Sequence, residues 1–275
     1  MQGWFCQKMV NKGMTTAAER KRAARIRSAS TVRSLMANAH RIPGNVQTGG
    51  TARYMKLIIG NKNYSSWSLR GWLAARQSGL SFEELTVHID GDDWQATRRE
   101  NGEFLPSAGK VPVLWDGDVV VWDSLAICEY LADKVGRDRF WPKNDAARGM
   151  ARAMVAEMHS SYLALRRACP MNIRARHAVE IDDAVKADIV RILGLWAEAR
   201  ARFGKGGPFL FGTFSAADIF YAPIVTRFIT YGIGVPGFAQ AYMQAIIEHA
   251  WMQEWIEGAL AEEWTISQFE VGENA

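Results

Sequence analysis

The sequence has little cysteine and no long apolar stretch. Its three cysteines, Cys6, Cys128 and Cys169, include no CxxC motif, which disfavours both a disulfide framework and a zinc site. No run of about 18 apolar residues occurs, so no membrane-spanning helix is expected. These absences predict a cytoplasmic protein with reduced thiols, without a metal centre and without a membrane partner.

The first 54 residues have almost no acidic side chains. They hold ten lysines and arginines against one acid, Glu19, a net charge of +9. Because the whole chain carries +4, residues 55–275 carry −5. The segment also lacks the apolar stretch of a secretory signal peptide. We favour a disordered leader, or an extension upstream of a start at Met55, over the two other interpretations, an organelle-targeting peptide and a nucleic-acid-binding tail.

From Met55 onward the apolar pattern predicts regular structure. With 48% hydrophobic and 23% charged residues, the composition is that of a globular protein. Residues 116–117 (Asp-Gly) are typical of a hairpin turn between two strands. The predicted order is β-α-β-α-β-β-α, over residues 55–60, 67–79, 81–89, 92–104, 111–117, 118–122 and 124–135.

Beyond residue 145 the pattern is helical only. Amphipathic segments are separated by glycine, proline or asparagine. They cover residues 146–168, 181–204, 215–232, 236–249 and 250–262. In the segment "FSAAD", at the start of the helix predicted over 215–232, Ser215 and Asp218 have the spacing of a capping box. We therefore predict an α/β domain over 55–135, a linker over 136–145 and an all-α domain over 146–275.

Pro112 stands between two valines in the segment "GKVPVL". An edge-strand proline is one explanation, because proline cannot donate to the hydrogen-bond ladder of a sheet. The other is a cis Val111-Pro112 bond that turns the N–H and C=O of Val111 outward, toward an extended ligand. We predict the cis bond.

The pair Asp123-Ser124 stands where the next helix is expected to begin. Ser124 can simply cap that helix. Alternatively, Ser124 and the helix N-terminus bind a ligand carboxylate, while Asp123 pairs with a ligand ammonium group.

Four motifs, in this order, resemble those of the cytosolic glutathione S-transferases: "YSSWSLR", "GKVPVL", "WDSLAICEYL" and "FSAADIFYAPI". The resemblance covers residues 55–275. It implies a thioredoxin-like α/β N-terminal domain, an all-α helical C-terminal domain and a homodimer. It also implies glutathione as co-substrate and a small electrophile as second substrate.

In glutathione transferases of the serine type, a hydroxyl at the start of the first helix stabilises the glutathione thiolate. Ser65 and Ser66 both qualify. The motif is most similar to the "SSC" signature of the zeta class, where the first serine activates the thiol, so we predict Ser65 and keep Ser66 as the alternative. The chain as a whole is expected to be most similar to zeta- and theta-like bacterial members. Trp67 stands where zeta proteins have cysteine, which disfavours isomerase activity and a cysteine-based mechanism.

The resemblance implies further site residues. Glutathione contacts are expected from Lys110, Val111, Asp123 and Ser124, and acceptor-pocket contacts from Trp67, His159 and Tyr162. Asn172 and Arg174 can meet an anionic acceptor, but a solvated basic loop is the favoured interpretation there. Core positions are expected for Cys128, Trp196, Trp251, Trp255 and Trp264.

We therefore predict a homodimeric glutathione transferase (EC 2.5.1.18-like) with a role in detoxification. The alternatives are a glutathione-dependent isomerase of the maleylacetoacetate type and a non-catalytic glutathione-binding dimer. The acceptor does not follow from the sequence, because variable loops and helix faces build its pocket.

Overall fold

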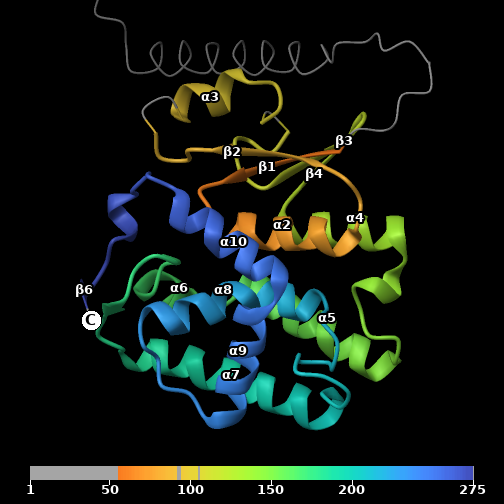
Figure 1. The fold of residues 1–275 in the computed structure, drawn as a ribbon, viewed down its shortest axis with the longest axis vertical. Helices are drawn as coiled ribbons and strands as arrows, with labels where there is room; N and C mark the ends of the chain where they lie inside the picture. Colours follow the sequence, from red (N-terminus) through yellow and green to blue (C-terminus); the bar gives the residue numbers. More distant parts are fainter. Residues whose placement is uncertain (1–54, 92–93, 105, 275) are drawn as a thin grey trace, which may run out of the picture. The chain divides into compact units, whose positions relative to one another are not determined.

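The protein is described here by a computed structural model over residues 55–91, 94–104 and 106–274 (Figure 1). Residues 1–54, on which the leader prediction rests, lie outside the described residues. Within the described part, no helix is long and apolar enough to cross a membrane.

The first half of the described chain, residues 55–135, is built on a four-stranded mixed sheet. Its strands are β1 (Met55–Gly60), β2 (Glu83–Val87), β3 (Val113–Asp116) and β4 (Val119–Trp122), in the spatial order β2-β1-β3-β4. β1 pairs with β2 in parallel, and β3 pairs antiparallel with both β1 and β4. Gly117, at a φ of 61°, makes the tight turn of the predicted hairpin.

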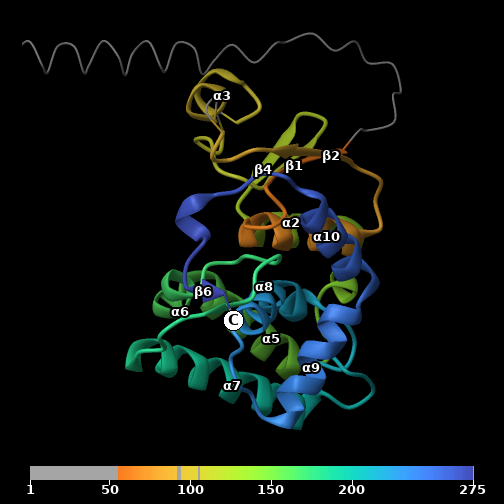
Figure 2. The same ribbon diagram turned by 60° about the vertical axis from the view of Figure 1, so that its left-hand side comes forward.

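Three helices cover this sheet: α2 (Ser66–Ser78), α3 (Trp94–Glu100) and α4 (Ser124–Val135). Figures 1 and 2 show α2 and α4 on one face and α3 on the other. α2 ends at Ser78, one residue before the end of the predicted range 67–79, and Gly79 follows it in the left-handed conformation (φ 71°) that glycine favours after a helix. The thioredoxin-like order expected from the sequence is confirmed.

The second half is built from helices, as predicted. They are α5 (Asp145–Ser160), α6 (Leu163–Ala168), α7 (Asp183–Phe203), α8 (Ala216–Thr230), α9 (Gly237–Glu248) and α10 (Ala250–Ala261). Short 3-10 helices lie at η1 (Arg137–Arg139) and η2 (Ser267–Phe269). One small addition is a two-stranded ladder between β5 (His177–Ala178) and β6 (Glu273–Asn274).

The single helix predicted over 146–168 is two helices in the structure. Tyr162 interrupts it with a left-handed φ of 60°. Its hydroxyl donates to Glu157 Oε1 at 2.8 Å, and the N–H of Leu165 donates to Asp188 Oδ2 at 3.0 Å. The carboxylate of Asp188 thus binds the start of α6, which the amphipathic pattern of the segment does not reveal.

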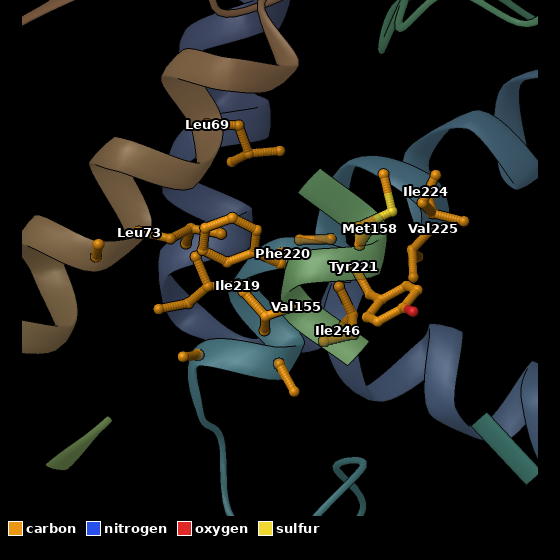
Figure 3. Close-up of a cluster of buried hydrophobic side chains, with 14 of the residues drawn as sticks. Leu69, Leu73, Val155, Met158, Ile219, Phe220, Tyr221, Ile224, Val225 and Ile246 are labelled. Carbon is orange, nitrogen blue, oxygen red and sulfur yellow. The ribbon is translucent and has the colours of Figure 1, made fainter. Parts of the chain in front are cut away.

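Helix α8 is buried along almost its whole length and joins the two halves. Figure 3 shows Ile219 and Phe220 of α8 lying between Leu73 of α2 and Val155 of α5. The predicted capping box at its start is confirmed, and the carboxylate of Asp218 accepts from the N–H of Ser215 at 2.8 Å. This shared core fixes the start of α2 against the helical half.

The predicted core positions are mostly confirmed. Cys128, Trp196 and Trp255 are fully buried, and Trp251 is half-buried against the core. Trp264 was predicted to be a core anchor, and this is wrong: its side chain is 36% exposed and stacks on His88 at 4.9 Å between ring centroids.

Candidate functional site

Ser65 is the N-cap of α2. Its Oγ accepts from the N–H of Ser68 at 3.3 Å and lies 2.8 Å from Ser68 Oγ, which in turn accepts from the N–H of Gly60 at 2.9 Å. Hydroxyl hydrogens rotate to suit their partners. In the structure Ser65 Oγ donates to Ser68 Oγ. Rotation of both hydroxyl groups would reverse this bond and leave the hydrogen of Ser65 able to point to a group bound above the helix.

Ser66 is the first residue of α2 and points to the helical half of the chain. Its Oγ accepts from Arg227 Nη2 of α8 at 3.3 Å. Both serines are thus nearly buried, with exposed fractions of 7% for Ser65 and 6% for Ser66, but in different environments. Ser65 faces its own turn, and Ser66 faces a guanidinium group.

The Val111-Pro112 bond is cis, as predicted. Among the described residues, the backbone N–H and C=O of Val111 have no hydrogen-bond partner. Pro112 lies directly against α2, because a Cβ added at Gly71 would come 2.7 Å from Pro112 Cγ and 2.9 Å from its Cβ. Glycine at position 71 therefore permits the close approach of α2 to the loop that carries Val111.

The cap of α4 is Asp123 and not Ser124, which corrects one of the two interpretations of this pair. Asp123 lies one residue outside the helix, at a φ of 76°, and its Oδ1 accepts from the N–H of Leu125 at 2.8 Å. Ser124 is the first helical residue. It is fully buried, and its hydroxyl has no hydrogen-bond partner among the described residues.

His159, in the last turn of α5, meets this cap from the helical half. Its Nε2 lies 3.2 Å from Asp123 Oδ2, and its ring contacts that of Trp67 edge-on at 5.1 Å between centroids. Burial lowers the pKa of His159 below its usual value; Arg70 and Arg166 add to this, and Asp123 opposes it. His159 is therefore a neutral imidazole at pH 7. The structure brings Trp67 and His159, expected in the acceptor pocket, together with Asp123, expected to contact glutathione.

Two arginines that the sequence analysis missed flank Trp67. The guanidinium carbon of Arg70 lies 4.7 Å from the Trp67 ring centroid, and that of Arg166 lies 4.8 Å from it. Arg70 is fully buried, and none of its three guanidinium nitrogens has a partner among the described residues. An arginine one turn after Ser66 reads as a surface residue in the sequence, because nothing in the pattern shows that α8 covers this face.

Other predicted contacts lie elsewhere. Tyr162 is buried against Glu157, and among the described residues no hydrogen bond or ring contact joins it to Trp67 or to either serine. Lys110 is exposed, with its backbone N–H donating to Ser107 Oγ at 3.0 Å.

The segment with Asn172 and Arg174 is not the solvated loop that the sequence analysis favoured. Asn172 is 1% exposed and accepts from Asn63 Nδ2 at 2.8 Å. Arg174 donates from its N–H to Asn63 Oδ1 at 2.9 Å and from Nη2 to the Tyr64 hydroxyl at 3.1 Å. These residues hold the loop that leads into Ser65.

Comparison with known proteins places these residues in a family. The glutathione S-transferase N-terminal domain model matches residues 64–134, and the C-terminal domain model matches residues 182–260. The chain is also similar to glutathione S-transferase L2, chloroplastic, of Arabidopsis thaliana, with 28% identity over 186 residues. That match covers 68% of this chain but only 56% of the plant protein.

Solved structures agree on the fold. A glutathione transferase homologue from Burkholderia, with bound glutathione, superposes with a TM-score of 0.56 at 20% identity, over 76% of this chain and all of that one. The theta-class enzyme of Xanthomonas axonopodis pv. citri, with glutathione bound, gives 0.53 at 22%, over 74% and 98%. At these identities the structural matches establish the fold alone. The two domain models together cover more than half of the chain, which therefore belongs to the glutathione S-transferase family.

Proposed function

We propose that the protein is a glutathione transferase that binds glutathione over the N-termini of α2 and α4. The observation that carries this proposal is Ser124. Its hydroxyl is fully buried, has no partner among the described residues and stands at the start of a twelve-residue helix. A buried hydroxyl without a partner costs free energy, and a helix N-terminus attracts carboxylates. A bound carboxylate satisfies both.

The rest of the tripeptide has matching groups nearby. Asp123 keeps its carboxylate 42% exposed while it caps α4, so it can also pair with the ammonium group of glutathione. The backbone of Val111 offers one N–H and one C=O to the peptide backbone of the ligand. Lys110, exposed beside Val111, adds a positive charge for the second carboxylate.

Ser65 is the group that we propose to stabilise the thiolate, as in the serine-type enzymes of zeta and theta class. When the bond between the two hydroxyl groups is reversed, so that Ser68 donates to Ser65, the hydrogen of Ser65 is able to point to the sulfur. A glutathione thiol has a pKa near 8.5 and is only slightly ionised at pH 7. A hydroxyl donor and the start of α2 both favour the thiolate. The thiol proton passes to water, and the sulfur then attacks the electrophilic carbon, whose leaving group departs with the bonding pair.

Relatives support this proposal without fixing the second substrate. The Burkholderia and Xanthomonas proteins hold glutathione in their structures, and the fold of this chain matches theirs. We also propose that the protein is a homodimer located in the cytoplasm.

Isothermal titration calorimetry with glutathione tests the proposed binding. Ser124→Ala should weaken binding by about tenfold or more, since it removes a hydrogen bond to a charged group. Ser160→Ala, at an exposed serine of α5, is the matched control and should bind as the wild type does. Absence of glutathione binding to the wild-type protein, or equal affinities in all three, would contradict the proposal.

Turnover of 1-chloro-2,4-dinitrobenzene then separates an enzyme from a binding protein. Release of chloride with formation of the thioether supports the transferase. Glutathione binding without turnover of this or any other electrophile in a panel would instead favour a non-catalytic glutathione-binding dimer.

A further inference from the structure

Three arginines from three helices gather at the start of α2. Arg70 belongs to α2, Arg166 to α6 and Arg227 to α8. Arg70 and Arg166 flank the Trp67 ring, and Arg227 donates to Ser66. The cluster therefore lies beside the proposed thiolate site, on its side toward the helical half.

Among the described residues, no ion pair joins a carboxylate to an arginine of this cluster. In the part of the chain that the structure describes, the arginines in ion pairs are all others: Arg76, Arg137, Arg148, Arg152, Arg191 and Arg202. Of the described carboxylates, Asp123 acts on the charge of Arg70, and its two oxygens already face Leu125 and His159. With three arginines against the one carboxylate of Asp123, the region carries an excess of positive charge in either protonation state of His159.

The three guanidinium groups differ in how many hydrogen bonds they donate. Arg227 donates to the carbonyl oxygens of Cys169 and Pro223, at 2.9 and 3.0 Å, and to Ser66. Arg70 donates to no described residue. Arg166 has a single long bond, from Nη1 to the carbonyl of His159 at 3.4 Å, and it is the one of the three that is partly exposed.

Repulsion among the three positive charges raises the free energy of the folded protein unless an anion binds beside them. Burial, and then repulsion from Arg166 and Arg227, lowers the pKa of Arg70 well below its usual value, and burial lowers the pKa of Arg166. Perturbed groups of this kind gather at functional sites more often than elsewhere. A ligand anion on Arg166 would offset the repulsion among the three cations, and it would lie against Trp67, close to Ser65 and Ser66.

We propose that the electrophilic substrate carries a carboxylate, and that Arg166 binds it against the face of Trp67. The inference rests on the proposed function, because it names the substrate class of that same site. One reachable guanidinium presents a planar pair of N–H groups, a geometry that matches the two oxygens of a carboxylate. The positive charges of Arg70 and Arg227, which are buried beside Arg166, strengthen the attraction of the site for the carboxylate.

A matched pair of substrates tests the proposal: 4-chloro-3-nitrobenzoate and its methyl ester. In both, the glutathione sulfur forms a bond to the ring carbon, and chloride leaves with the electrons of the broken carbon–chlorine bond. The wild-type enzyme should prefer the acid over the ester in kcat/KM, although the carboxylate deactivates the ring relative to the ester. Equal or reversed preference, after correction for the uncatalysed rates, would overturn the proposal.

Variants assign the preference to one residue. Arg166→Gln should lower kcat/KM for the acid by about ten- to a hundredfold more than kcat/KM for the ester, since it removes a hydrogen bond between charged groups. Arg166→Lys should restore part of the loss. Arg167→Gln, at the exposed neighbour on α6, is the control and should change neither substrate. An equal loss on acid and ester in Arg166→Gln would overturn the proposal, as would a loss in the control.

Equilibrium binding keeps this inference separate from the proposed function. We would measure 3-nitrobenzoate and 3-nitrobenzamide, which do not react, by calorimetry with and without glutathione. Binding of the benzoate that needs Arg166, in a protein that does not bind glutathione, would support the anion site and contradict the transferase. Glutathione binding with no preference for the benzoate would leave the transferase standing and overturn the anion site.

Discussion

His159 Nε2 lies 3.2 Å from Asp123 Oδ2, so a helix of the second half contacts the cap of a helix of the first. Asp123 thus has two tasks in the structure, because its other oxygen binds the start of α4. His159 in turn touches Trp67. Through this contact, the protonation of one histidine affects the region that we propose for both substrates.

The first prediction concerns the acid stability of the protein. In the unfolded chain a histidine titrates near pH 6.5, whereas burial lowers the pKa of His159 in the folded state. The unfolded state therefore binds more protons as the pH falls below about 6.5, and the free energy of unfolding decreases. His159→Gln should reduce this decrease between pH 7 and pH 5 by up to about 1.4 kcal/mol per pH unit.

Urea unfolding at several pH values measures this slope. Asp123→Asn provides the comparison, because Asp123 raises the pKa of His159. Without that carboxylate the pKa of His159 should fall further, and the loss of stability should extend to lower pH. The explanation fails if the slope in His159→Gln equals that of the wild type.

The second prediction concerns the contact between α2 and Pro112. Gly71→Ala should lower the free energy of unfolding by about 1–3 kcal/mol, because its Cβ would overlap the proline ring. Gly149→Ala is the matched control. Gly149 lies in α5, where an added Cβ would meet nothing within 4 Å, so this change should stabilise the protein by about 0.5–1 kcal/mol. Thermal or urea unfolding measures both changes. A Gly71→Ala variant more stable than the wild type would contradict the close contact between α2 and Pro112.

The third prediction concerns the network that holds the loop before Ser65. Asn172→Ala should cost about 1–3 kcal/mol of stability, because it leaves Asn63 Nδ2 and the carboxylate of Glu270 without their buried partner. Gln244→Ala, on the exposed side of α9, should stay within about 0.5 kcal/mol of the wild type. Equal stability of the two variants would show that the network does not hold the loop.

Much of the fold could be predicted from the sequence, because its signals are local. The strand of residues 55–60, the stop at Gly79 and the capping box of Ser215 each depend on a few neighbouring residues. The break at Tyr162 could not be predicted in this way. It depends on Asp188, which is far along the chain and binds the start of α6.

The candidate site was predicted in part. Trp67 and His159, both expected in the acceptor pocket, are in ring contact, and His159 also meets Asp123. Arg70 and Arg166 were missed, since arginines on amphipathic helices usually face solvent. The packing of α8 against α2 buries Arg70, and Arg166 of α6 is half-buried beside Trp67. One of the two interpretations made Ser124 the cap of α4, because serine is a frequent cap, whereas the structure has Asp123, with a positive φ, as the cap one residue earlier.

The most direct test of the central claim is the ultraviolet titration of enzyme-bound glutathione, which follows thiolate absorbance against pH. We predict that the wild type lowers the pKa of the bound thiol clearly below the value near 8.5 of a free thiol. Ser65→Ala should raise it again by about one to two units, the effect of one hydrogen bond to a charged group. Ser66→Ala should change it less. A bound thiol that titrates like free glutathione, or that no serine variant shifts, would contradict activation of glutathione by this site.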